Sequence, residues 1–157
     1  MKPTATVMLD RGLSVLLREL GIDGRRVLRR ARLAADLLGH EWTRLSVLDY
    51  FALIEAIEAE ADDPTLPLRM ASASSPELFS PPVFAALCSS NLKVAVKRLA
   101  THKRLVAPMS IVWTERRPGL EVSWRWDDPA LRPPRLLTEF ELVFLVQLAR
   151  IGTRGPI

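Results

Sequence analysis

The sequence predicts a mainly helical α+β domain with one small antiparallel β-hairpin or sheet packed on helices. Most of the 157 residues repeat apolar side chains at helical spacing, and one stretch beyond residue 108 alternates with a period of two. Hydrophobic residues make up 48% and charged residues 25%, a composition typical of globular domains. We therefore predict one domain over residues 11–152, between a flexible tail at 1–10 and a C-terminal tail at 153–157.

Three helices are predicted in the first part of the chain. The first has apolar residues at positions i, i+3, i+4 and i+7, namely Leu13, Leu16, Leu17 and Leu20. Asp23 is placed to cap a second helix, and Ser46 with Asp49 three residues later predicts the start of a third. Pro64 ends that third helix, because the residue before a proline resists helical geometry. Residues 34–45, which include His40, are expected to form a loop.

The middle of the chain predicts two short helices and one longer helix. The short ones are expected over residues 65–75 and at about 83–89. The longer helix begins at either Ser90 or Asn91, both of which are good capping residues, and continues to about Val106. Its basic side chains, Lys103 included, are expected to lie away from its inner side.

A β-hairpin is predicted after Pro108. Two runs that alternate apolar and polar residues flank a turn at Pro118 and Gly119, which is a good hairpin signal. One face of the hairpin is expected to hold the apolar residues Ile111, Trp113, Leu120, Val122, Trp124 and Trp126. Because a two-stranded hairpin is marginally stable alone, this face should pack on helices.

The last predicted helix is apolar on nearly all sides. Thr138 followed by Glu141 forms a capping box, and the helix is expected to run to about Ile151. A helix of this kind needs cover on most of its faces. Either it lies at the centre of the domain, or a second chain or a continuation of this one covers it.

The charge pattern is uneven and does not favour nucleic-acid binding. The net charge is +4 overall, but residues 46–80 have a net charge of −6 and residues 81–117 of +6. The basic clusters at 25–32 and 93–104 are most simply read as solvated helix faces. No helix–turn–helix pattern stands out, so we expect no direct contact with nucleic acid.

Signatures of enzymes, cofactors, metals and membranes are missing from the sequence. No phosphate-binding glycine loop, nucleophile elbow or HExxH zinc motif is present. Cys88 could act as a nucleophile if His102 lay near it, but a lone cysteine is more often a small packing residue. We expect no catalytic residue, no cofactor and no bound metal. Apolar runs such as 142–146 are far too short to span a membrane, and no secretory signal is visible, so we expect a cytoplasmic protein.

Several segments, taken in order, resemble the N-terminal effector-binding, arabinose-binding-like region of AraC-type transcription regulators. Residues 11–28 resemble its first helix pair, and residues 44–71 its long helix followed by an Asp-Pro break and a Leu-x-Leu segment. Residues 87–126 resemble its next helix and hairpin, and residues 136–152 the apolar helix that follows. The order and spacing of these segments carry the resemblance, because each one alone is an ordinary Leu- and Ala-rich pattern.

The resemblance implies a sensor without enzymatic activity. Such regulators continue into a C-terminal DNA-binding domain with two helix–turn–helix units, which these residues do not match, so we expect a fragment or a truncated relative. The implied partner is a small-molecule effector whose binding is transmitted to the DNA-binding domain. We expect three tryptophans of the hairpin to form the apolar walls of the effector-binding site and two further side chains to form its polar contacts. These residues are Trp113, Trp124 and Trp126, with Tyr50 and His102.

The main alternative is an interaction module that binds no ligand. In this hypothesis the exposed apolar helix at 138–151 pairs two chains into a homodimer, through Phe140, Phe144 and Leu148. Sensing and dimerisation are compatible, so this alternative removes only the ligand site. Nucleic-acid binding by the basic clusters and a hydrolase built on Cys88 remain weaker alternatives.

Overall fold

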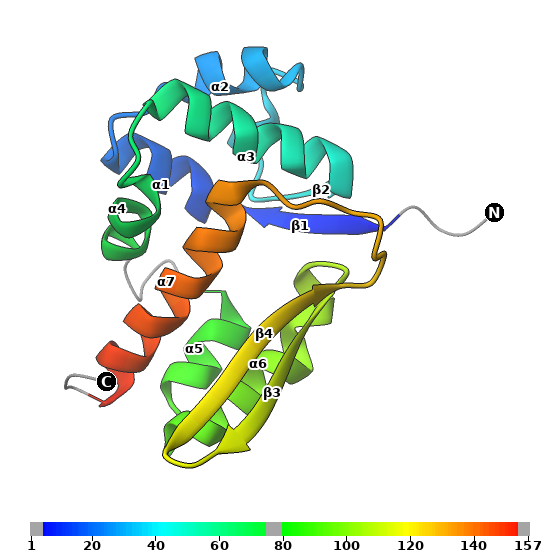
Figure 1. Cartoon of the computed structure of the whole chain (residues 1–157). Helices are drawn as coiled ribbons and strands as arrows, with labels where there is room; N and C mark the ends of the chain where they lie inside the picture. The colour runs from blue at the N-terminus through cyan, green and yellow to red at the C-terminus, as the bar shows by residue number, and fades with distance from the viewer. Residues whose placement is uncertain (1–4, 75–79, 154–157) are drawn as a thin grey trace.

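The computed structural model describes residues 5–74 and 80–153, and it confirms the mainly helical α+β class (Figure 1). Its elements up to residue 74 are β1 (Thr6–Asp10), α1 (Gly12–Glu19), α2 (Gly24–Ala31), a 3₁₀ turn (Leu37–Gly39), β2 (Trp42–Ser46), α3 (Val47–Ala61) and α4 (Leu66–Ala73). The later elements are α5 (Pro81–Leu87), α6 (Leu92–Val106), β3 (Met109–Arg116), β4 (Gly119–Trp126) and α7 (Arg135–Thr153).

These elements form two groups joined by α7. The N-terminal group runs from β1 to α4, and the hairpin group contains α5, α6, β3 and β4 (Figure 1). Helix α7 contacts α3 and α4 of the first group and α5 and α6 of the second, and α6 also contacts β1. The helix that was predicted to be apolar on nearly all sides is α7, and it lies between the N-terminal group and the hairpin group of its own chain.

A second small sheet corrects the prediction for the first residues of the chain. The prediction of a flexible tail at 1–10 is wrong for residues 6–10, and the prediction of a loop at 34–45 is wrong for residues 42–45. These two segments form β1 and β2, which pair antiparallel. Val7 lies opposite Leu45, and both side chains are buried. Each strand has five residues, too few to show a clear alternation, and the partners are far apart in sequence. The rest of the predicted tails, 1–4 and 154–157, lies outside the described residues.

Three predicted helix starts are confirmed by their capping hydrogen bonds. The Asp23 carboxylate accepts from the Arg25 backbone N–H at 2.9 Å. The Ser46 hydroxyl oxygen accepts from the Asp49 N–H at 3.1 Å. The side-chain carbonyl of Asn91 accepts from the Val94 N–H at 3.0 Å, which decides in favour of Asn91 over Ser90. Each side chain satisfies a backbone donor that the first turn leaves without an intrahelical partner.

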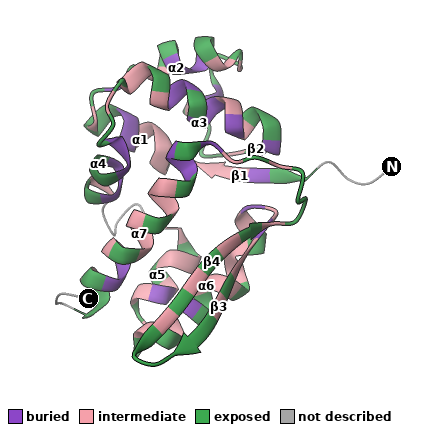
Figure 2. Cartoon of the chain, viewed as in Figure 1, coloured by how far each residue is buried: buried purple, intermediate pink, exposed green. Residues whose placement is uncertain are grey.

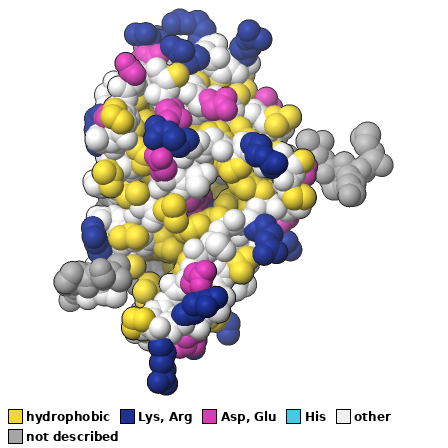
Figure 3. Space-filling view, viewed as in Figure 1, with side chains coloured by type: hydrophobic (Ala, Val, Ile, Leu, Met, Phe, Trp, Pro, Cys, Tyr) yellow, Lys and Arg dark blue, Asp and Glu magenta, His cyan; other side chains and the backbone are white. Residues whose placement is uncertain are grey.

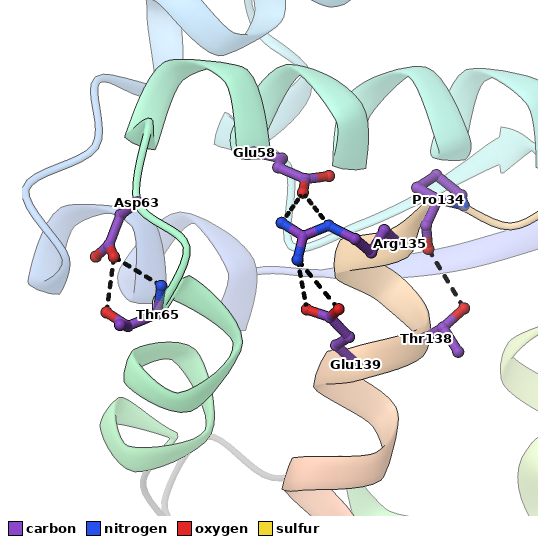
Figure 4. Close-up of polar contacts among 7 residues, drawn as sticks. All are labelled: Glu58, Asp63, Thr65, Pro134, Arg135, Thr138 and Glu139. Carbon is purple, nitrogen blue, oxygen red and sulfur yellow. Dashed lines mark hydrogen bonds and ion pairs between the residues drawn. The ribbon is translucent and has the colours of Figure 1, made fainter.

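The predicted start of the last helix is wrong by one turn. Helix α7 begins at Arg135, so Thr138 lies inside the helix, and its hydroxyl donates to the Pro134 carbonyl oxygen at 3.4 Å (Figure 4). Ion pairs hold the first turn: Arg135 Nη2 lies 2.6 Å from Glu58 Oε1 on α3, and Arg135 Nη1 lies 3.1 Å from Glu139 Oε1. A contact with a residue 77 positions away cannot be read from the local sequence.

The hydrophobic core surrounds α3 (Figure 2). Its largest fully buried side chains come from five helices and are Leu17, Val27, Leu53, Ile57, Leu66 and Leu136. The predicted hairpin is also confirmed, with Ile111 opposite Trp124 and Trp113 opposite Val122. The predicted apolar face of the hairpin is more buried than its polar face, and β3 packs on α6.

The acid stability of the corner between α3 and α4 is testable at Asp63. Asp63 Oδ1 accepts hydrogen bonds from the Thr65 hydroxyl and N–H (Figure 4). Asp63 Oδ2 accepts from Arg69. The Thr65 and Arg69 bonds lower the pKa of Asp63 from 3.8 to about 2. Because the folded pKa is depressed, this carboxylate stabilises the fold fully above about pH 4 and loses that effect as the pH falls towards 2.

We therefore expect Asp63→Asn to be less stable than the native protein at pH 6, because the amide has no charge to pair with Arg69. The difference should shrink steadily between about pH 4 and pH 2. Urea unfolding at several pH values measures it, and a difference that is independent of pH would contradict the assigned role of Asp63.

Candidate ligand-binding site

A cavity of about 260 Å³ lies where the N-terminal group, the hairpin group and α7 meet. We call it the junction cavity. Its lining comes from β1, α1, α3 and α4 on one side and from α5, α6, β3 and β4 on the other, with α7 closing it. Hydrophobic side chains gather around a hollow in this part of the surface (Figure 3). Small-molecule sites are commonly concave and apolar, with a few converging polar groups.

The walls of the junction cavity are mostly aliphatic and aromatic. Two aromatic walls, Tyr50 of α3 and Trp126 of β4, were predicted as ligand contacts. The Trp126 ring meets Phe51 edge-on, at 5.0 Å between centroids and 87° between planes. This geometry is favourable for two aromatic rings, and it fixes the orientation of the Trp126 wall against the core.

Polar groups converge on this apolar space from four elements. Lys103 of α6 and Glu141 of α7 form an ion pair at 2.6 Å, with side chains only 20% and 18% exposed. Asp10, at the end of β1, and Tyr50 of α3 also line the cavity, as do Ser74 and Ser80. Asp10 Oδ1 accepts from the Gly12 N–H at 2.7 Å, which holds the carboxylate beside the start of α1.

Tyr50 remains a neutral phenol in this setting. Burial raises the pKa of its hydroxyl above the usual value, and the nearby carboxylates of Glu141 and Asp10 raise it further. The hydroxyl can therefore both donate and accept a hydrogen bond at any ordinary pH.

A second, smaller cavity of about 90 Å³ adjoins the first and contains two more predicted residues, His102 of α6 and Trp124 of β4. The lining residues that the two cavities share include Lys103, Glu141 and Phe144. The Trp124 indole nitrogen is buried and has no hydrogen-bond acceptor among the described residues. An unsatisfied buried donor is costly.

The structure thus brings together four of the five predicted ligand residues in two adjoining cavities. The fifth, Trp113, lies further along β3 and lines neither cavity. The three residues predicted at a dimer interface also line these cavities. Phe140 lines the junction cavity, Leu148 lines the smaller one, and Phe144 lines both. The exposed apolar side chains of α7 include Leu142 and Val146, which are 48% and 46% exposed.

Sequence analysis missed the charged residues of the site. Lys103 was expected to lie away from the inner side of its helix, and Glu141 was assigned to a capping box, yet the two meet across the cavity. One signal was present, since Glu141 lies between Phe140 and Leu142 in an apolar segment. Its partner could not be identified, because the two residues are 38 positions apart.

Other candidate sites are weaker. A groove of about 370 Å³ between α5, α6 and the end of α7 has no charged side chain among its lining residues. Cys88 is exposed at the end of α5 and does not line the junction cavity. Over residues 5–74 and 80–153, no three His, Cys, Asp or Glu side chains are grouped to hold a metal ion. Within the same residues, no helix combines the length and the apolar character needed to cross a bilayer.

Comparison with known proteins places the chain in a family. A model of the arabinose-binding domain found at the N-terminus of AraC transcription regulators matches residues 21–157. The chain belongs to this family. The resemblance inferred from the order of helices and hairpin is confirmed over most of the chain. No curated protein matches the sequence.

The family match covers the elements that build most of the junction cavity. Residues 21–157 include α3, α4, α6, the hairpin and α7, whereas β1 and α1 precede the matched region. Tyr50, Lys103, Trp126 and Glu141 therefore lie within the family region, and Asp10 lies before it.

Proposed function

We propose that this domain is a sensor that binds a small, largely apolar effector in the junction cavity. The observation that carries the proposal is the convergence of Tyr50 and the Lys103–Glu141 pair on an otherwise apolar space. The volume of about 260 Å³ is slightly below the range of about 300–1,000 Å³ common for drug-sized ligands, which suits a smaller metabolite. Membership of a family of AraC-type N-terminal domains supports the same function.

In this proposal Trp126 is an apolar wall and Tyr50 a polar contact. Trp124 and His102 contact a ligand only if it extends into the smaller cavity. Trp113 lines neither cavity, so its role as a ligand contact stays a prediction from the sequence. The acidic and basic residues that the sequence did not single out, Lys103 and Glu141, orient the ligand.

The family description names arabinose, but the cavity favours a less polar molecule. A pentose carries oxygen on every carbon and needs many hydrogen-bond partners when it is buried. The lining offers few polar side chains beyond Asp10, Tyr50, Lys103 and Glu141 among its apolar residues. We therefore infer an effector with a substantial hydrocarbon part.

The position of the cavity suggests how binding is transmitted. A ligand there touches both the N-terminal group and the hairpin group, so it favours the arrangement that fits it better. An effector shifts a conformational equilibrium only by its difference in affinity between the two states. We propose that an attached DNA-binding domain senses this shift in the cytoplasm. We also propose that the sensor domain itself has no catalytic role.

Filling the cavity tests the proposal. Ala107 lies at the end of α6, is buried and lines the junction cavity. We expect Ala107→Phe to weaken binding of any effector found in a thermal-shift screen of metabolites by at least about ten-fold, because the added ring occupies the ligand's space.

Ala34→Phe, at an exposed position between α2 and the 3₁₀ turn, is the matched control. If Ala107→Phe does not fold by circular dichroism, Val106→Phe places the ring at the next lining residue. Unchanged affinity in a folded, cavity-filled variant would contradict the proposed site.

Homodimerisation is a separate proposal. Phe140 and Phe144 face the cavity, so a dimer built on α7 would use its exposed residues Leu142 and Val146. Sedimentation velocity is expected to show a dimer that Leu142→Glu together with Val146→Glu disrupts. A monomer at high concentration would contradict this proposal and leave the sensor proposal intact.

A further inference from the structure

The charges that line the junction cavity do not balance. Among its described lining residues are two carboxylates, Asp10 and Glu141, and one ammonium group, Lys103. The Lys103–Glu141 pair neutralises one carboxylate. The cavity therefore carries one excess negative charge.

Both carboxylates keep an oxygen available. Glu141 Oε1 is the atom that contacts Lys103, and Asp10 Oδ1 is the atom that accepts from Gly12. Among residues 5–74 and 80–153, no donor is found for Glu141 Oε2 or Asp10 Oδ2. The Tyr50 phenol lines the same cavity as both carboxylates, and their charges raise its pKa.

Aromatic rings line the same cavity. Tyr50, Trp126, Phe140 and Phe144 come from three different elements. Phe140 and Phe144 lie 5.5 Å apart between centroids, on successive turns of α7. The face of an aromatic ring attracts a cation, most strongly when water is excluded. Carboxylates and aromatic rings together therefore offer two kinds of attraction to positive charge.

We propose that the effector is an organic cation, a small hydrocarbon carrying a protonated or quaternary ammonium group. The proposal rests on the proposed function of the junction cavity. The cationic group lies against Glu141 and Asp10 beside Tyr50, and the hydrocarbon part packs on Trp126 and Phe140. A bound anion would have to displace Glu141 from Lys103 and would then face two carboxylates. A neutral ligand would leave the excess negative charge of the cavity lining without a partner.

Three probes of similar shape test the charge preference. They are 2-phenylethylamine, which is a cation at pH 7, 2-phenylethanol, which is neutral, and phenylacetate, which is an anion. Ligand-observed NMR titration up to millimolar concentration, at one pH and ionic strength, gives their relative affinities. We expect the amine to bind about ten-fold more tightly than the alcohol and the carboxylate to bind most weakly.

A substitution locates the preference in the cavity. Glu141→Gln should lower the affinity for the amine relative to that for the alcohol, so that the ratio of the two affinities falls towards one. Glu139→Gln is the matched control, because it removes the same charge from the same helix at a residue that pairs with Arg135 outside the cavity. If Glu141→Gln does not fold, Asp10→Asn removes the second carboxylate while its amide oxygen can still accept from Gly12.

The outcomes separate the two proposals. Equal binding of the three probes, or tightest binding of phenylacetate, would overturn the cation proposal and leave the ligand site standing. An amine preference that Glu139→Gln abolishes as strongly as Glu141→Gln would also overturn it, because the preference would then arise from the overall charge. No binding by any probe would overturn the cation proposal and count against the proposed function as well.

Discussion

Replacing Ile57 by alanine is expected to lower the free energy of unfolding by about 2–5 kcal/mol. Ile57 lies on α3 at the centre of the core and is completely buried. The substitution removes its contacts and leaves a cavity that the surrounding helices fill only in part. Urea or thermal unfolding measures the loss.

Leu48→Ala on the same helix is the control for this prediction. The Leu48 side chain is 70% exposed, so its truncation should change the free energy of unfolding by no more than about 0.5 kcal/mol. Similar losses for the two variants would mean that α3 is not the centre of the core.

Replacing Trp126 by alanine is expected to affect both stability and binding. Trp126 packs edge-on against Phe51 of the core and forms a wall of the junction cavity. Truncating a fully buried tryptophan to alanine lowers the free energy of unfolding by about 3–5 kcal/mol. Because Trp126 is only partly buried, we expect a loss of about 2–4 kcal/mol. Effector binding should weaken by at least about ten-fold, since the ligand loses an apolar wall.

The matched control is Trp42→Ala on β2, where the indole is 51% exposed and does not line the cavity. We expect it to cost less than about 1 kcal/mol and to leave effector binding unchanged. If Trp42→Ala impaired binding as much as Trp126→Ala, the site would have to be placed elsewhere.

The helices and the hairpin could be predicted because their signals are local. The cap at Asp23, the cap at Ser46 and the alternation around Gly119 each involve residues within a few positions of one another. The pairing of β1 with β2 could not be predicted, because Val7 and Leu45 are far apart in the sequence and no local pattern links them. The start of α7 was misplaced for the same reason, because Glu58 on a distant helix holds Arg135.

The candidate site could be predicted only in part. Trp126 was predicted as an apolar wall and Tyr50 as a polar contact, and both line the junction cavity. Trp113 shares that alternation but lies too far along the hairpin, because the cavity forms only where the hairpin base meets β1 and α7. The Lys103–Glu141 pair depends on the packing of α6 against α7, which a single sequence does not reveal.

The central claim is that the effector binds in the junction cavity, and the four tryptophans offer the most direct measurement of it. Each indole N–H gives its own resonance in a ¹⁵N-labelled sample, and titration with an effector follows all four together. We expect the Trp126 resonance to shift with saturation and the resonances of Trp42 and Trp113 to stay in place. A saturable shift at Trp42 or Trp113 with Trp126 unmoved would contradict the claim.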